Sequence, residues 1–116
     1  MSSKAESPAA AAGPLQGIRI LDLSAVVSGP LATMVLAEQG ADVVKVEPPG
    51  LGDSGRHIGP GVDGCSALFA ICNRAKRSIV IDLATPDGVE LIRRLAAQVD
   101  VVVENFRPGV VERLGI

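Results

Sequence analysis

Short runs rich in Val, Ile and Leu alternate along this chain with longer segments that have the spacing of helices. Strands are expected at residues 18–23 (IRILDL), 43–47 (VVKVE), 78–82 (SIVID) and 101–104 (VVVE). These runs are apolar without a clean alternation of polar residues, which is typical of strands buried on both faces. The pattern therefore predicts an α/β domain with a parallel sheet, helices on both faces and right-handed crossovers.

The segments between these runs carry helix signals. Residues 31–39 have apolar side chains at helical spacing, and residues 65–72 (CSALFAIC) are expected to form a short buried helix. Thr85 has the features of an N-cap, with Pro and Asp in the first turn after it, and predicts a helix to about Val99. Pro108 is expected to open a final helical turn.

The composition narrows the classes of protein to which this chain can belong. Hydrophobic residues make up 47% of its 116 residues, which excludes a disordered chain. The formal net charge of −2 gives no basic surplus for nucleic acid or an anionic membrane, and two Phe with no Trp or Tyr leave almost no platform for base stacking. No apolar run approaches the roughly 18 residues that span a bilayer. We therefore expect no nucleic acid and no membrane as partners.

The first 14 residues are rich in Ala, Ser and Pro, and we expect them to form a flexible tail before a working domain at 15–116. This tail lacks the apolar core of a secretory signal, and two Cys are too few for a disulfide-rich secreted scaffold. We therefore expect a cytoplasmic protein. Cys65 and Cys72 are expected to be buried, unreactive thiols.

Function is expected where the strands end, because ligands of open parallel sheets bind outside the carboxyl ends of the strands. The segments that follow the strands are 24–29, 48–64, 83–85 and 105–109. The first of them presents Val26 and Val27, which suits either a site for a flat ring or simple hydrophobic packing. Phe69 is expected in the core, whereas Phe106 belongs either to the core or to a site.

Residues 50–55 (GLGDSG) match the dinucleotide-binding pattern G-x-G-x-x-G, but we expect the match to be false. A true fingerprint follows the first strand and opens a helix whose N–H groups hold a pyrophosphate. Here the glycines follow the second strand and lead into RHIGPG, which cannot form a regular helix. Glu47, at the position where such enzymes keep an acid for the ribose, therefore carries little weight.

The basic residues leave two interpretations open. Arg74, Lys76 and Arg77 precede the third strand, and Arg107 and Arg113 lie near the fourth. They either bind phosphates through charge-assisted hydrogen bonds or form a solvated surface with local ion pairs. His57 is the single histidine and has no second His or Cys at ligand spacing, so no metal is expected.

Three segments, in this order, resemble a known family. They are residues 15–53 (LQGIRILDLSAVVSGPLATMVLAEQGADVVKVEPPGLGD), 73–88 (NRAKRSIVIDLATPDG) and 100–116 (DVVVENFRPGVVERLGI). Together they resemble the N-terminal part of the class III CoA-transferases, the CaiB/BaiF family, which includes formyl-CoA transferase and is related to α-methylacyl-CoA racemase. The order and spacing of GADVVKVE, KRSI and VENFRPG are far more specific than a single glycine pattern.

The resemblance implies a Rossmann-like sheet that is incomplete in this chain, and a homodimer with interlocked chains. It implies exchange of coenzyme A between an acyl-CoA and a carboxylate acceptor through a covalent intermediate on an aspartate. That aspartate lies downstream of RPGVVERLG in the family, so no catalytic residue is expected within this chain. We therefore expect a fragment, inactive alone, that supplies part of the CoA site.

The resemblance also implies which residues contact CoA. They are Val27 and Ser28 in the first turn, Ile81, Asp82, Leu83 and Ala84 after the third strand, Asn105, Phe106 and Arg107 after the fourth, and Arg113. Pro48 stands where relatives often have Arg, and Ala84 stands where they often have Lys. We therefore expect phosphate affinity to depend more on Arg74, Arg107 and Arg113.

Two alternatives remain open beside the transferase. One is a racemase-type enzyme of the same family, whose His/Asp pair also lies beyond residue 116. The other is a non-catalytic α/β module that binds CoA or another nucleotide. The loop GLGDSGR and the segment between it and KRSI favour the transferase.

Overall fold

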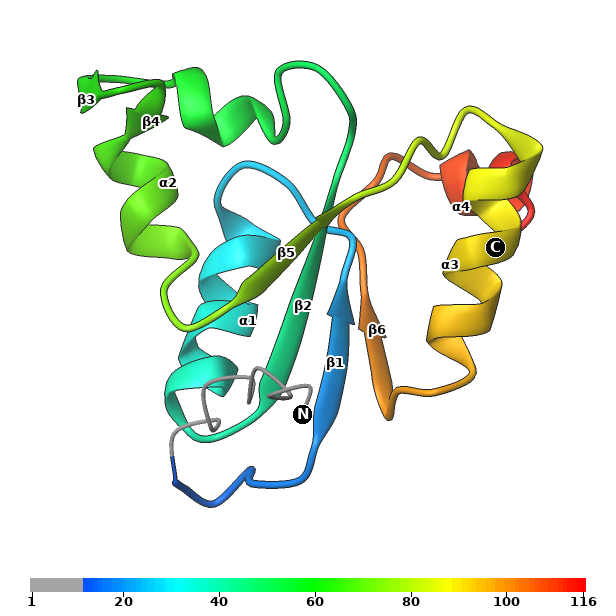
Figure 1. Ribbon diagram of the computed structural model, residues 1–116, viewed down its shortest axis with the longest axis horizontal. Coiled ribbons are helices and arrows are strands. Elements are labelled where there is room, and N and C mark those ends of the chain that lie inside the picture. Colours follow the sequence, from blue (N-terminus) through cyan, green and yellow to red (C-terminus); the bar gives the residue numbers. More distant parts are fainter. Residues whose placement is uncertain (1–11) are drawn as a thin grey trace, which may run out of the picture.

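A parallel sheet of four strands lies at the centre of the computed structural model, which describes residues 12–116 (Figure 1). Its strands are β1 (Arg19–Asp22), β2 (Asp42–Glu47), β5 (Arg77–Val80) and β6 (Val101–Val103). All three pairings are parallel, as the apolar runs predicted. The tail expected at 1–14 lies outside the described residues apart from its last three positions.

The strands lie in the order β5-β2-β1-β6, which is the order of a Rossmann-like sheet. From β1 the chain adds β2 and then β5 on one side, and β6 then pairs with the other edge of β1. The chain therefore runs from β1 to β5 in one direction and then crosses back to β6, so the strand order reverses between β1 and β6. A reversal of this kind opens a crevice at the carboxyl edge of the sheet.

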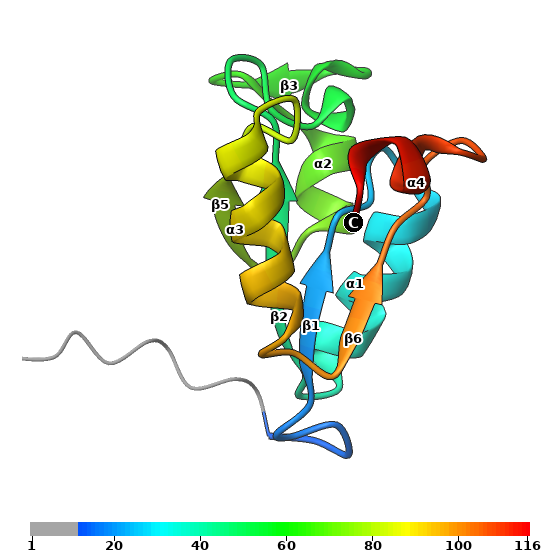
Figure 2. The same ribbon diagram turned by 90° about the vertical axis from the view of Figure 1, so that its right-hand side faces the viewer.

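The helices are α1 (Ser28–Glu38), α2 (Ala67–Cys72), α3 (Pro86–Ala96) and α4 (Val110–Leu114). Figure 2 shows α1 and α3 on opposite faces of the sheet. Helix α1 begins three residues earlier than expected, because Pro30 lies in its first turn, where its missing N–H group has no partner to lose. Thr85 caps α3, as predicted, and its Oγ1 accepts a hydrogen bond from the Gly88 N–H at 3.0 Å.

Alternate strand residues form a separate core on each face of the sheet. On the α3 face, Leu21, Leu23 and Val46 pack with Ile81 and with Ile92 of α3. On the α1 face, Ile20, Ala37, Ala41 and Val43 form the second core. The outer strands β5 and β6 have mostly exposed residues, which agrees with a sheet that is incomplete in this chain.

The long loop after β2 has more structure than its composition suggested. It contains the 3₁₀ helix η1 (Ser54–His57) and a small hairpin of β3 (Gly61–Val62) and β4 (Cys65–Ser66). The helix expected at 65–72 therefore begins only at Ala67, because Ser66 is its N-cap and accepts a hydrogen bond from the Phe69 N–H at 3.0 Å. Phe69 and Cys72 are buried as expected, but Cys65 is only half-buried, and the prediction was wrong there.

Candidate functional site

A cavity of about 410 Å³ lies at the carboxyl ends of the strands, and we call it the strand-end cavity. It is lined by residues 23–25 after β1, Val46, Pro48 and residues 52–54 at and after β2, residues 81–84 after β5, and Phe106 after β6. All four segments that the sequence analysis predicted to bind a ligand therefore contribute to its wall. Most of that wall is aliphatic or aromatic, which suits a flat organic group.

Five of the residues implied by the family resemblance line this cavity. They are Ile81, Asp82, Leu83, Ala84 and Phe106. Asp82 Oδ1 accepts a hydrogen bond from the Ala84 N–H at 2.9 Å, so this carboxylate shapes the loop that follows β5. Phe106 is also partly buried against the core on the α3 face, and its role in a site stays a prediction.

Other implied residues lie beside the cavity without lining it. Asn105 Oδ1 accepts a hydrogen bond from the Ala25 N–H at 2.9 Å, and its Nδ2 donates to the Ala25 C=O at 2.8 Å. Asn105 therefore connects the segment after β6 to the turn after β1. Val27 is the N-cap residue of α1 and is exposed, and Ser28 is the first residue of that helix. The turn meets the cavity through Ser24 and Ala25 instead.

Arg113 lines a second, more open hollow of about 380 Å³. This hollow shares Leu83 and Ala84 with the strand-end cavity, so the two spaces adjoin. Arg107 is exposed in the segment between β6 and α4.

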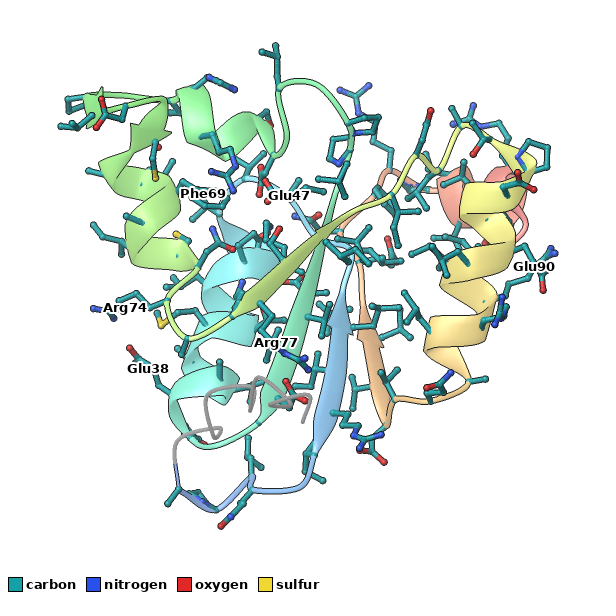
Figure 3. The ribbon with its side chains drawn as sticks, viewed as in Figure 1. Glu38, Glu47, Phe69, Arg74, Arg77 and Glu90 are labelled. Carbon is teal, nitrogen blue, oxygen red and sulfur yellow. The ribbon has the colours of Figure 1, made fainter. Side chains whose placement is uncertain are left out.

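Two arginines of the basic cluster before β5 lie away from the strand-end cavity, toward the opposite end of the sheet. Figure 3 shows Arg74 and Arg77 well away from Glu47, which ends β2. Arg74 pairs with Glu38 at 3.0 Å, and Arg77 pairs with Asp42 at 2.8 Å. Both are exposed pairs, so the ion-pair interpretation fits these two arginines, and the expected role of Arg74 in phosphate binding has no support in this geometry.

Lys76 fits neither interpretation, because it is buried against Asp22 at 2.9 Å. Asp22 is fully buried and also accepts hydrogen bonds from the Ser24 hydroxyl and from Thr33 Oγ1 at 2.6 Å. Burial raises the pKa of Asp22, but these donors outweigh it and the pKa lies below its usual range. Burial lowers the pKa of Lys76, although Asp22 opposes that effect.

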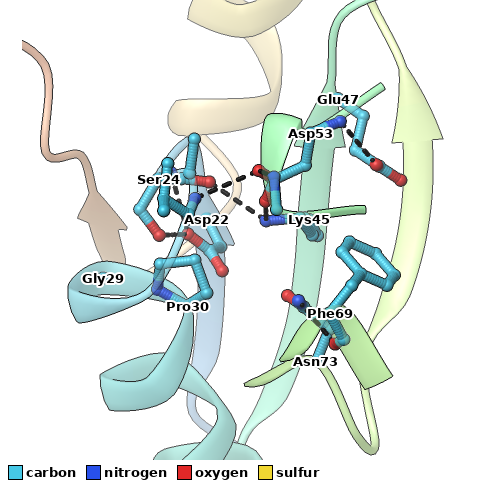
Figure 4. Close-up of polar contacts among 12 residues, drawn as sticks. Asp22, Ser24, Gly29, Pro30, Lys45, Glu47, Asp53, Phe69 and Asn73 are labelled. Atoms are coloured by element: carbon cyan, nitrogen blue, oxygen red, sulfur yellow. Dashed lines mark hydrogen bonds and ion pairs between the residues drawn. The ribbon is translucent and has the colours of Figure 1, made fainter. Parts of the chain in front are cut away.

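A second buried pair joins β2 to the loop that follows it. Lys45 Nζ lies 2.7 Å from Asp53 Oδ2 and donates a hydrogen bond to the Ser24 C=O at 3.0 Å (Figure 4). Asp53 Oδ1 accepts hydrogen bonds from the N–H groups of Val26 at 3.0 Å and Gly55 at 2.8 Å. Burial raises the pKa of Asp53, yet the bonds from Lys45 and from the two amides bring it below its usual value.

Glu47 has partners on both carboxylate oxygens. Oε1 accepts from Arg56 Nε at 2.7 Å and from the Asp53 N–H at 3.0 Å, and Oε2 accepts from Arg56 Nη2 at 2.8 Å and from Ser78 Oγ at 2.6 Å. The hydrogen bonds from Arg56 are the main reason why the pKa of Glu47 falls to about 2. A carboxylate so fully occupied is not free to bind a ribose, which agrees with the rejection of a dinucleotide fingerprint.

The sequence analysis missed these buried charges, although one signal was present. In VVKVE, Lys45 and Glu47 alternate with Val44 and Val46, so they share the face of Val43. A strand covered on both faces buries whatever side chains it carries, and buried charges need partners. Lys45 and Glu47 were therefore candidates for buried ion pairs on sequence grounds.

The turn between β1 and α1 contains a strained residue. Val26 has a φ of +73°, in the left-handed region that β-branched residues rarely adopt. Such a conformation costs about 1–3 kcal/mol and persists only where the surroundings enforce it. Here the Asp53 carboxylate accepts the Val26 N–H, and Asn105 binds the residue before it.

Among residues 12–116, no group of three or more His, Cys, Asp or Glu side chains is placed to hold a metal ion. No helix over the same residues has the length and apolar character to cross a membrane.

The apolar strand-end cavity lies where the strand order of the parallel sheet reverses, which is the position at which open α/β sheets bind their ligands. Residues 15–116 match the family described as CoA-transferase family III. The chain therefore belongs to CoA-transferase family III, as the sequence motifs indicated.

Known relatives agree with this membership. The chain is 48% identical over 104 residues to succinyl-CoA:glutarate CoA-transferase of Mus musculus, a match that covers 89% of this chain and 24% of the relative. It is 45% identical over 103 residues to formyl-CoA:oxalate CoA-transferase of Escherichia coli, covering 88% of this chain and 25% of that protein. A CAIB/BAIF family protein from Brucella suis has the same fold, with a TM-score of 0.84 at 43% identity over 91% of this chain and 29% of that one. The chain thus spans about a quarter of the length of these relatives.

Proposed function

We propose that this chain is the N-terminal part of an acyl-CoA:carboxylate CoA-transferase and that it supplies one wall of the CoA-binding crevice. The observation that carries the proposal is the strand-end cavity, in which five residues implied by the family resemblance lie together. Membership of CoA-transferase family III supports CoA as the ligand. The segment at residues 15–116 would then belong to the large, CoA-binding domain.

The composition of the two adjoining hollows suggests how CoA divides between them. Within the described part of the chain, residues 12–116, no Lys or Arg lines the strand-end cavity, and its surfaces at Leu23, Ile81 and Phe106 suit a flat base. The second hollow contains Arg113, and a guanidinium suits phosphate oxygens through charge-assisted hydrogen bonds. We place the adenine end of CoA in the strand-end cavity and the phosphates toward Arg113.

The reaction itself needs parts beyond this chain. Transfer of CoA through a covalent intermediate requires a nucleophile, and the family resemblance places the nucleophilic aspartate after residue 116. We therefore propose that the chain alone is inactive, and that the complete protein is an interlocked cytoplasmic homodimer acting on an acyl-CoA and a carboxylate acceptor. Both curated relatives named above are transferases, which favours this reaction over a racemase.

Titration calorimetry of the 116-residue chain tests the binding role. We expect CoA to bind more tightly than NAD, and Arg113→Ala to weaken CoA binding by about tenfold or more, the effect of one charge-assisted hydrogen bond. Arg77→Ala is the matched control and should leave CoA affinity unchanged, because Arg77 pairs with Asp42 at the other end of the sheet. Tighter binding of NAD than of CoA would contradict the proposal.

An activity assay tests the missing nucleophile. The chain is incubated with an acyl-CoA and a carboxylate acceptor, and the thioester products are separated by chromatography. We expect no transfer by this chain alone. Turnover would show that one of its own carboxylates is the nucleophile.

A further inference from the structure

We propose that the buried ion pair of Lys45 and Asp53 positions the turn at residues 24–27 for CoA binding, a role that rests on the proposed function. Neither residue is placed among the CoA contacts that the family resemblance implies. Lys45 and Asp53 are 1% and 2% exposed. Both act on the turn through hydrogen bonds to its backbone.

The turn has backbone contacts with side chains from other strand ends at three successive residues. Lys45 donates to the Ser24 C=O, Asn105 binds both backbone groups of Ala25, and Asp53 accepts the Val26 N–H. These side chains come from β2, from the loop after β2 and from the segment after β6. Long-range contacts therefore hold the turn, in addition to the local hydrogen bonds from Ser24 to Asp22.

The sequence of the turn opposes the shape that it adopts. A valine at φ +73° is strained, and without external contacts it would return to negative φ. Gly55 packs directly on Val26, because a Cβ at Gly55 would lie 3.2 Å from the Val26 carbonyl oxygen. Asp53 also accepts the Gly55 N–H at 2.8 Å, so one carboxylate fixes both sides of this contact.

This arrangement matters for binding because the same residues line the strand-end cavity. Ser24 and Ala25 form its wall on the side of β1, and Asp53 forms part of its wall on the side of β2. If Val26 returns to negative φ, the backbone on either side of it moves and this wall changes shape. The ion pair then raises CoA affinity, because it increases the fraction of molecules in which the turn has the binding-competent shape.

The test uses a double variant, Lys45→Met with Asp53→Ala, which removes both charges and so leaves no lone buried ion. We expect it to bind CoA about tenfold more weakly, which corresponds to a binding-competent fraction of about one tenth. Asp42→Ala with Arg77→Met removes an exposed pair from the other end of β2 and serves as the matched control. That control should change CoA affinity by less than about twofold.

Val26→Gly supplies a rescue that a general loss of stability would not show. Glycine adopts positive φ without strain, so the turn can keep its shape when the ion pair is absent. Adding Val26→Gly to the double variant should restore at least about a third of the lost affinity. Unchanged CoA affinity in the double variant, or no recovery on adding Val26→Gly, overturns the proposal.

Amide hydrogen exchange separates this proposal from the proposed function. In the double variant, the Val26 N–H should exchange at least about tenfold faster, while the Gly88 N–H, bonded to Thr85 Oγ1 at the start of α3, should be unchanged. Equal acceleration at both amides, or none at Val26, contradicts the positioning role. If the wild-type chain binds no CoA, the proposed function fails, and exchange at Val26 still decides whether the ion pair sets the turn.

Discussion

The two ends of the sheet use ion pairs in opposite ways. At the amino end, Asp42 pairs with Arg77 on the surface, where both side chains are at least 39% exposed. At the carboxyl end, Asp22 with Lys76 and Lys45 with Asp53 are at most 2% exposed. Exposed pairs contribute little to stability, whereas removing one partner of a buried pair leaves an uncompensated charge.

This difference indicates what each end does. Strain at Val26, buried charges and the strand-end cavity all lie at the carboxyl end. A buried ion pair is weak evidence for stability, because desolvation opposes the attraction between its charges. We therefore interpret the carboxyl end as organised for binding, and the amino end as an ordinary solvated surface. Four predictions test this comparison.

The largest effect is expected for Lys76→Met. The substitution leaves Asp22 buried without its cation, and we expect the free energy of unfolding to fall by about 3–5 kcal/mol. Urea unfolding at pH 7 measures the change. Adding Asp22→Asn to this variant should recover part of the loss, and a loss below about 1 kcal/mol would remove the distinction between the two ends.

Acid should lower the stability of the folded protein, because Glu47 at the carboxyl end of the sheet becomes protonated. Because its pKa in the folded protein is about 2 against an ordinary 4.5, its stabilising contribution is complete above pH 4.5 and is lost as the pH falls toward 2. The loss amounts to about 3 kcal/mol for this group, and the lowered pKa values of Asp22 and Asp53 act in the same direction. Urea unfolding measured from pH 6 to pH 2.5 follows this change.

Glu47→Gln is the control for the acid effect. Its stability should vary less between pH 4.5 and pH 2.5 than that of the wild type, because one of the titrating groups is gone. Identical pH profiles for the two proteins would show that Glu47 has an ordinary pKa in the folded state.

A smaller effect is expected for Ser66→Ala. The buried Ser66 hydroxyl accepts the Phe69 N–H and donates to the Gly55 C=O at 2.6 Å, so it connects α2 to η1. Loss of a cap and of a buried hydrogen bond should cost about 1–2 kcal/mol in thermal unfolding. Ser66→Thr keeps the hydroxyl and should recover part of this loss. An unchanged melting temperature for Ser66→Ala would show that the connection contributes nothing.

The smallest effect is expected for Arg77→Ala at the amino end. Its exposed pair with Asp42 should contribute about 0–1 kcal/mol, and this contribution should decrease further in 1 M salt. Urea unfolding at low and high salt measures both quantities. A loss of stability as large as that of Lys76→Met would show that the exposed and buried ion pairs contribute equally.

The sequence predicted those parts of the fold that local patterns determine. The four apolar runs became the four strands of the sheet, and Thr85 with Pro86 marked the start of α3. The 3₁₀ helix η1 and the β3–β4 hairpin were missed, because strands of two residues have no periodicity to detect. Their positions depend on contacts such as that of Ser66 with Gly55, which no local pattern reveals.

The sequence predicted the part of the candidate site whose residues directly follow strands. Leu83, Ala84 and Phe106 follow strands, and parallel pairing brings strand ends together, so their meeting in the strand-end cavity follows from the fold. The pairing of Lys76 with Asp22 joins residues 54 positions apart and was not visible in the sequence. The strain at Val26 was also hidden, since no residue preference suggests positive φ for a valine.

We expect CoA to bind at the carboxyl end of the sheet and not at its amino end. An NMR titration of the isotope-labelled chain with CoA tests it most directly, because every backbone amide reports separately. We expect the shifted amides to cluster at Ser24, Leu83 and Phe106, and the amide signals of Asp42 and Arg77 to stay in place. Shifts concentrated at the amino end, or no shifts at all, would contradict it.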